Sequence, residues 1–153
     1  MAGNMNVVVV AESEHGPYGQ NVTAGRHTFE ADEPNSAGGQ DSGPSPYDYL
    51  MAGLGACTAM RLRSYAHRHN LALRQITIEL RHETIDAGAG TNIDEFHRLI
   101  YLDGDLTEEQ RLELFKAADH CAVSQTLRNS SLIETRLAPA ILLETAVPET
   151  NAA

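Results

Sequence analysis

The chain has 153 residues, of which 42% are hydrophobic and 21% charged, and its formal net charge is −10. A chain of this length can bury a core of ordinary size, so we expect residues 1–153 to form a single folded domain. The acidic excess excludes nucleic acid as an expected partner, because proteins bind phosphate backbones mainly through Lys and Arg.

The N-terminal segments predict a small antiparallel sheet followed by a long loop. Residues 5–11, MNVVVVA, are apolar and mostly β-branched, and residues 20–32 hold two short strand-like runs around Ala24 and Gly25. We expect these runs to form a three-stranded meander. Residues 32–46, DEPNSAGGQDSGPSP, are almost all turn formers, so we expect a long loop without regular structure.

A long helix is predicted from Pro46 to His69. Ser45 can cap its first turn, proline suits the first helical position, and Asp48 stands three residues after Ser45, as in a capping box. Apolar residues then follow at helical spacing until Asn70, which is a good stop. This helix is the longest element and is expected to be central.

The second half of the chain predicts two strands, a helix and a final strand. Residues 73–84 and 93–106 alternate in the period of a half-buried strand and pair across residues 85–92. Thr107 and Gln110 open a helix with a second capping box, which places Cys121 at the C-terminus of that helix. Residues 131–139, SLIETRLAP, predict a last strand before a frayed tail, VPETNAA.

The sequence also bears on the cellular compartment. No apolar run reaches the about 20 residues that a membrane helix needs, and the first residues lack the pattern of a secretion signal. We therefore expect a soluble, cytoplasmic protein with no membrane partner. In a reducing compartment, a disulfide between Cys57 and Cys121 would be transient rather than structural.

Cys57 lies in an unusual run of small residues, AGLGACTAM. Gly53 and Gly55 each cost a helix about 1 kcal/mol relative to alanine, which is tolerated where a backbone or a ligand comes close. A tight helix crossing and a positioned thiol both explain the run, and the two interpretations are compatible. Arg61, one turn further on, either favours the thiolate of Cys57 or is simply exposed.

Asp48 is the nearest carboxylate before Cys57. The two residues are nine positions apart, which on a helix corresponds to a rise of roughly 13 Å and about half a turn of phase. One helix cannot bring the two side chains together, so a shared site would need two copies of the chain. Capping of Ser45 is the simpler role for Asp48.

Known metal and cofactor motifs are absent from the sequence. There is no HExxH or CxxC, and His67 and His69 point in different directions on a helix. The Gly53-x-Gly55 pair lacks the third glycine of a dinucleotide fingerprint, and no serine lies in a GxSxG elbow. The sequence therefore predicts neither a metal site nor an organic cofactor.

Four segments, in this order and spacing, resemble the OsmC-like family of osmotically inducible and organic hydroperoxide resistance proteins. They are GRHTFEADEP, GGQDSGPSPYDYLMAGLGACTAMRLRSYAHRHNLAL, LDGDLTEEQRLELFKAADHCAV and TL...IETRL. The resemblance extends from Gly25 to Leu137. It implies an α/β fold of the α+β type, in which an N-terminal meander and further strands pack around long central helices. It also implies an intertwined homodimer with active sites at the subunit interface.

The resemblance further implies a thiol-dependent peroxidase that reduces organic hydroperoxides. Cys57 would attack the peroxide and become a sulfenic acid, and Cys121 would resolve it as a disulfide, which a dihydrolipoamide-like dithiol would reduce. The family's activating carboxylate maps best to Asp48. Its arginine has no counterpart in EHGPYGQN, so Arg26 is the nearest candidate, and the resolving motif reads CAVSQTL where close relatives often read CPVHRTL.

Two other interpretations remain open. The altered second motif and the missing arginine also suit a redox-inactive OsmC-like protein that binds a small apolar ligand in the same interface cleft. Alternatively, both cysteines are packing residues, since free cysteine is among the most buried residue types.

Overall fold

The computed structural model describes residues 7–129 and 131–138, and its first layer is the predicted meander. Strands β1 (Val8–Glu12), β2 (Gln20–Ala24) and β3 (His27–Ala31) pair antiparallel in that order. Gly25 adopts a positive φ of 60° in the turn between β2 and β3, a conformation that glycine tolerates without strain. Residues 5 and 6 of the first predicted strand lie outside the described residues.

The loop after β3 is more ordered than the sequence predicts, because it contains the short 3₁₀ helix η1 (Asn35–Ala37). Asp32, which is 3% exposed, holds this loop together through its side chain. The carboxylate accepts hydrogen bonds from the backbone N–H groups of Glu33, Gln40 and Ser42 at 2.8, 2.9 and 3.2 Å. Burial raises the pKa of Asp32, but these bonds outweigh it and hold the pKa below its usual value.

Helix α1 (Pro46–Arg68) begins at the predicted residue, and both halves of the capping box are formed. The hydroxyl of Ser45 accepts from the backbone N–H of Asp48, whose carboxylate accepts from the backbone N–H of Ser45. The helix ends at its C-cap His69, before Asn70 takes a positive φ of 52°. Its buried residues are Leu54, Gly55, Thr58, Leu62 and Ala66.

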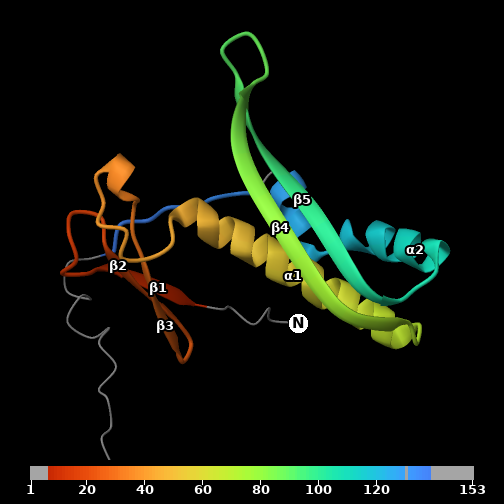
Figure 1. The fold of residues 1–153 in the computed structure, drawn as a ribbon. Helices are drawn as coiled ribbons and strands as arrows, with labels where there is room; N and C mark the ends of the chain where they lie inside the picture. The colour runs from red at the N-terminus through yellow and green to blue at the C-terminus, as the bar shows by residue number, and fades with distance from the viewer. Residues whose placement is uncertain (1–6, 130, 139–153) are drawn as a thin grey trace, which may run out of the picture.

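A long hairpin lies across α1 (Figure 1). Strands β4 (Ala72–Asp86) and β5 (Asn92–Asp105) pair antiparallel, with Ile78 opposite Ile100, and agree with the predicted strands to within a few residues. Alternate positions are half-buried, so one face of the hairpin covers the helices and the other is open. The hairpin tip extends well beyond the helices.

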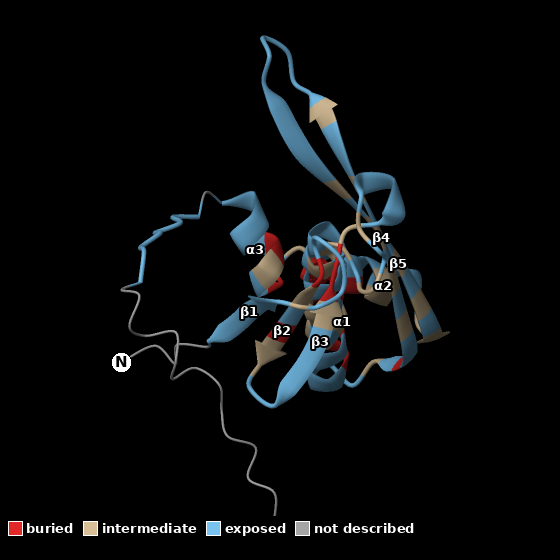
Figure 2. Cartoon of the chain, turned by 90° about the vertical axis from the view of Figure 1, so that its left-hand side faces the viewer, coloured by how far each residue is buried: buried red, intermediate tan, exposed pale blue. Residues whose placement is uncertain are grey.

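Helix α2 (Glu108–Ala118) is capped by Thr107 as predicted. It packs against α1, which in turn packs against β4. The core cluster consists of Leu62, Ala66, Leu73, Leu114, Ala117 and Ala118. Figure 2 shows that buried residues gather around the helices, whereas most of the hairpin is exposed. No helix in residues 7–129 and 131–138 is long and apolar enough to cross a membrane.

The segment after α2 corrects two predictions. Cys121 does not end α2; it is the N-cap of a further short helix, α3 (Ala122–Arg128). Residues 131–138 form no strand, and Leu132, Ile133 and Leu137 are 97%, 86% and 100% exposed. An alternating apolar pattern becomes a strand only beside a free sheet edge, and this segment pairs with none of the described strands. The predicted tail, 147–153, lies outside the described residues.

Candidate functional site

The structure brings the two cysteines together, although they come from elements far apart in the sequence. Cys57 lies on α1 and is half-buried, whereas Cys121 follows α2 and is 1% exposed. Both are free thiols, and Cys57 is among the neighbours that lower the pKa of Cys121. The hydroxyl of Thr58 lies 3.6 Å from the sulfur of Cys121. One thiol is therefore partly open and the other is enclosed.

Cys121 occupies an environment that favours its thiolate. Its sulfur accepts a hydrogen bond from the backbone N–H of Ser124 at 3.3 Å, because Cys121 caps α3. Burial raises the pKa of the Cys121 thiol. The hydrogen bond from Ser124, the contacts with Thr58 and Cys57, and the charge of Arg98 together outweigh burial and hold that pKa below its usual value.

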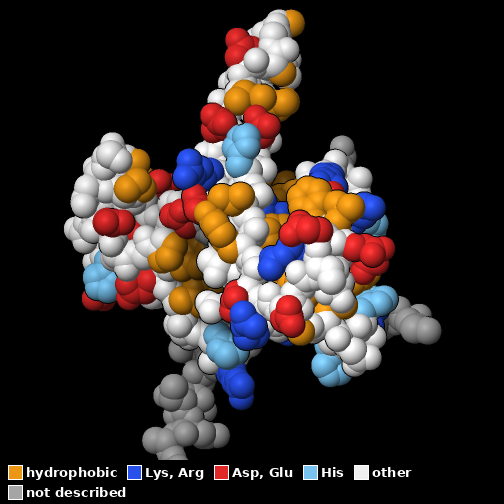
Figure 3. Space-filling view, turned by 45° about the vertical axis from the view of Figure 1, so that its right-hand side comes forward, with side chains coloured by type: hydrophobic (Ala, Val, Ile, Leu, Met, Phe, Trp, Pro, Cys, Tyr) orange, Lys and Arg blue, Asp and Glu red, His pale blue; other side chains and the backbone are white. Residues whose placement is uncertain are grey.

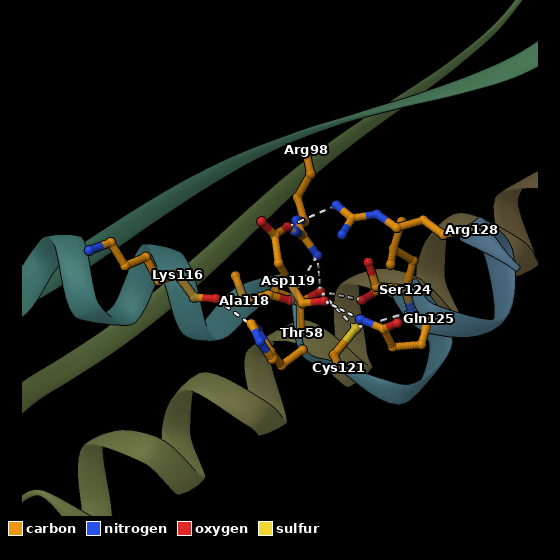
Figure 4. Close-up of polar contacts among 11 residues, drawn as sticks. Thr58, Arg98, Lys116, Ala118, Asp119, Cys121, Ser124, Gln125 and Arg128 are labelled. Carbon is orange, nitrogen blue, oxygen red and sulfur yellow. Dashed lines mark hydrogen bonds and ion pairs between the residues drawn. The ribbon is translucent and has the colours of Figure 1, made fainter.

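Arg98, on β5, is the residue that sequence reasoning missed. Its guanidinium donates to the hydroxyl of Thr58 at 2.8 Å and to the carboxylate of Asp119 at 2.9 Å. Arg128, on α3, donates to the same carboxylate oxygen at 3.0 Å. Figure 4 shows these groups converging beside Cys121. The available signal was alternation, because Arg98 occupies an inward position of a strand whose other inward residues are Phe96, Ile100 and Leu102.

Asp48 and Arg26 do not join this pair. The Asp48 carboxylate accepts hydrogen bonds from the hydroxyl of Ser45 at 2.6 Å and from the backbone N–H of Ser45 at 2.9 Å. Both bonds lower the pKa of Asp48, and the bond from the hydroxyl has the larger effect. Asp48 lies with Ala52 and Ala56 along a hollow of about 360 Å³ between α1 and β4. Arg26 is exposed in the β2–β3 turn and has no hydrogen bond or ion pair among the described residues.

Two further polar groups stand apart from the cysteines. The Nε atom of Arg61 is buried and has no hydrogen-bond partner within the described part of the chain, beside a hollow of about 240 Å³ that Glu113 and His120 also line. On the hairpin, ligand atoms of Glu83, Glu95 and His97 lie within 4.8 Å of one another and are exposed. His97 bonds to Glu83 at 2.8 Å, so this pairing accounts for the cluster without an ion.

Comparison with known proteins identifies the family. The sequence profile described as OsmC-like protein matches residues 39–136. The chain belongs to the OsmC-like family. The matched residues include both cysteines, Asp48 and Arg98, whereas Arg26 lies before them. No curated protein sequence matches the chain significantly.

Solved structures share the OsmC-like fold. An OsmC-like protein of Mycoplasma pneumoniae has a TM-score of 0.69 at 14% identity, over 82% of this chain and 89% of that one. An organic hydroperoxide resistance protein of Legionella pneumophila gives 0.65 at 17% identity, over 84% and 92%. OhrB of Bacillus subtilis, also named for organic hydroperoxide resistance, gives 0.59 at 24% identity, over 81% and 90%. These structures confirm the predicted OsmC-like α/β fold.

Proposed function

We propose that this OsmC-like protein is a thiol peroxidase that reduces organic hydroperoxides through Cys57 and Cys121. The family supports a peroxide-related stress function, since structural relatives are named for organic hydroperoxide resistance. The observation that carries the proposal is the meeting of the half-buried Cys57 with the enclosed, acidified Cys121. Packing alone does not require two thiols at one point.

The proposed reaction has three steps that need no metal or bound cofactor. The thiolate of Cys57 attacks the outer oxygen of the hydroperoxide, the O–O bond breaks, and the alcohol leaves after taking a proton. The resulting sulfenic acid condenses with Cys121, which forms the S–S bond and releases water. A dihydrolipoamide-like dithiol then reduces the disulfide by thiol exchange and is itself oxidised to a cyclic disulfide. A cytoplasmic location would supply this reductant.

The homodimer is part of the proposal. A two-stranded hairpin with an open face is marginally stable alone, and residues on its outer face, such as Leu99 and Tyr101, are 54% and 49% exposed. Figure 3 shows apolar side chains on the hairpin and on the neighbouring surface. A second copy would cover such surface and would be needed to bring Asp48 or Arg26 to a Cys57 site.

An apolar hydroperoxide is the proposed substrate class. On α1, Leu50 and Met60 are 44% and 71% exposed and can contact an apolar chain, whereas Leu54 is 5% exposed and belongs to the core. Burial of such a chain favours an apolar organic hydroperoxide over hydrogen peroxide, because the hydrophobic contribution to binding grows with the apolar area buried.

A ligand-binding protein without redox chemistry is the second candidate. A hollow of about 310 Å³ between β5 and α3 is lined by Leu54, Phe96 and Leu127, with Arg98 and Arg128 at its wall. Asp94 and Glu95 also line this hollow, so a small ligand there would contact both apolar and charged groups. The separation of Asp48 and Arg26 from the thiols within one chain also favours this alternative.

Steady-state turnover distinguishes the two candidates. Cumene hydroperoxide and dihydrolipoamide are mixed with the wild-type chain, Cys57→Ser or Cys121→Ser, and hydroperoxide consumption is followed. We expect turnover by the wild type, none by Cys57→Ser, and, when the dithiol is left out, a dimedone-reactive sulfenic acid at Cys57 in Cys121→Ser. Persistence of the hydroperoxide with the wild-type protein would refute the peroxidase.

A further inference from the structure

We propose that Arg98 and Thr58 are positioning residues that hold Cys121 as a preformed thiolate, aimed at Cys57. The reaction of that thiolate with a Cys57 sulfenic acid rests on the proposed function. Its ionisation does not, and can be measured without any peroxide.

The first observation is the chain of contacts from Arg98 to the sulfur. The side chain of Arg98 is 13% exposed, and its Nη1 donates to the Thr58 hydroxyl at 2.8 Å. That hydroxyl lies 3.6 Å from the Cys121 sulfur. Because Arg98 occupies a lone pair of the hydroxyl oxygen, the oxygen is less available as an acceptor for a Cys121 S–H group. Rotated toward the sulfur, the Thr58 hydroxyl would donate its hydrogen to the Cys121 thiolate.

The single hydrogen of the Thr58 hydroxyl can reach the sulfur by rotation of the hydroxyl. In the structure it is donated to the carbonyl of Leu54 at 2.7 Å. That carbonyl stands four residues earlier on α1, so it also accepts the helical backbone N–H of Thr58. Rotation of the hydroxyl toward Cys121 therefore leaves no buried carbonyl unpaired.

The second observation is the other arm of Arg98, which fixes the segment that carries Cys121. Nη2 of Arg98 bonds to Asp119 at 2.9 Å, and Nη1 reaches the carbonyl of Ala118 at 3.4 Å. Arg128 holds the same Asp119 oxygen from α3 at 3.0 Å. Arg98 thus ties β5, α1 and the end of α2 together beside the sulfur, and the shared Asp119 carboxylate links them to Arg128 at the end of α3 (Figure 4).

The chemical consequence is a resolving thiol that needs no base at the moment of reaction. The Cys121 thiolate attacks the sulfur of the Cys57 sulfenic acid, the S–S bond forms, the S–O bond breaks, and hydroxide leaves and takes a proton from solvent. Because Cys121 is buried, the peroxide cannot reach its thiolate. The thiolate therefore reacts with the Cys57 sulfenic acid and not with the peroxide.

The first experiment titrates Cys121 alone. The chain has only two cysteines, so Cys57→Ser leaves Cys121 as the sole thiol and keeps a hydroxyl donor at position 57. Ultraviolet thiolate absorbance is followed against pH in this background, with Arg98→Gln, Thr58→Val or Thr58→Ser added. We expect Arg98→Gln and Thr58→Val to raise the titration midpoint by about one pH unit, and Thr58→Ser to leave it nearly unchanged.

Arg74→Gln is the matched control. Arg74, on β4, also forms an arginine–aspartate pair, with Asp103 at 2.8 Å, but its side chain is 65% exposed. This substitution should not move the Cys121 midpoint. A midpoint equal to that of the control in both Arg98→Gln and Thr58→Val would overturn the proposal. If Arg98→Gln fails to fold, the Thr58 pair decides alone.

The second experiment separates the two reaction steps in the chain that keeps both cysteines. One equivalent of alkyl hydroperoxide is added, and sulfenic acid and disulfide are quantified over time by quenching. Arg98→Gln should slow disulfide formation by on the order of tenfold, in line with the loss of thiolate, and leave peroxide reduction unchanged. Equal disulfide rates would contradict the proposal. A wild-type chain that does not react with the hydroperoxide would refute the proposed function. The titration would still test whether Cys121 is held as a thiolate.

Discussion

The thiols of Cys57 and Cys121 differ in their exposure to solvent. Cys57 is partly exposed, which suits the approach of the proposed hydroperoxide, while Cys121 is 1% exposed, accepts a hydrogen bond from the backbone N–H of Ser124 and lies 3.6 Å from the hydroxyl of Thr58. A reactive thiolate that solvent cannot reach is protected from direct oxidation. The pair therefore suits a sequence in which Cys57 reacts first and Cys121 second.

This order predicts the fate of Cys57 when its partner is removed. In Cys121→Ser, the sulfenic acid has no thiol to condense with, so excess hydroperoxide should carry Cys57 to the sulfinic acid. Intact-mass analysis would show the gain of two oxygen atoms, whereas the wild type under the same conditions should show loss of two hydrogen atoms. A wild type that gains oxygen as readily as the variant would contradict the order.

Asp32 carries a second prediction at the residue scale. Its depressed pKa means that its contribution to stability is complete above the unfolded value of about 3.9 and is lost as the pH falls through the lower folded value. Asp32→Asn should lower the melting temperature at neutral pH, and the difference from the wild type should shrink in acid. The exposed neighbour Asp41→Asn is the control and should change little. A deficit that is independent of pH would contradict the assignment.

Long-range contacts set the limit of sequence reasoning at this scale. Cys57 and Cys121 were candidates because of the family resemblance, but the residues themselves did not show that the thiols meet. Arg98 was missed, because its only local signal is a charge at an inward strand position and its partners Thr58 and Asp119 lie far from it in the sequence. Nothing local in the sequence specifies such a junction.

Elements were predictable where local chemistry determines them. Ser45, Pro46 and Asp48 specify the start of α1, and strict alternation specifies β4 and β5. Helix α3 has only seven residues and a cysteine N-cap, so it carries neither a long period nor a common capping residue. The strand expected at 131–139 depends on a neighbouring edge, which no local pattern can supply.

The two helical glycines give a matched prediction at the element scale. A Cβ at Gly55 would lie 2.8 Å from a methyl group of Leu80, whereas a Cβ at Gly53 would meet nothing within 4 Å in the chain. Gly53→Ala should therefore raise the free energy of unfolding by about 1 kcal/mol, the usual helix gain. Gly55→Ala should gain less or lose stability, because Leu80 must move. Urea denaturation measures both, and equal gains would contradict the contact.

Many large apolar side chains of the described residues are exposed to solvent. The outer face of the hairpin, the strand β1 and residues 132–137 all present large apolar side chains, among them Val10 at 57% and Leu132 at 97% exposure. Exposed apolar area of this extent indicates an interaction surface, and a second copy is the proposed occupant.

Assembly can be tested by sedimentation of the reduced protein. We expect twice the mass of the chain, and Leu99→Glu, which places a charge at a residue 54% exposed on the outer face of the hairpin, should shift the protein toward monomer. The chain itself should tolerate this charge, so circular dichroism should show unchanged helix content. A stable wild-type monomer would contradict the shared assembly.

Disulfide mapping shows directly whether Cys57 and Cys121 form one redox pair. Reduced protein is treated with one equivalent of an alkyl hydroperoxide, blocked, and digested with trypsin under non-reducing conditions. Cleavage after arginine and lysine places Cys57 in peptide 27–61 and Cys121 in peptide 117–128. We predict that these two peptides appear as one cross-linked species within a single chain. Recovery of both peptides with free thiols, while the hydroperoxide persists, would contradict the account.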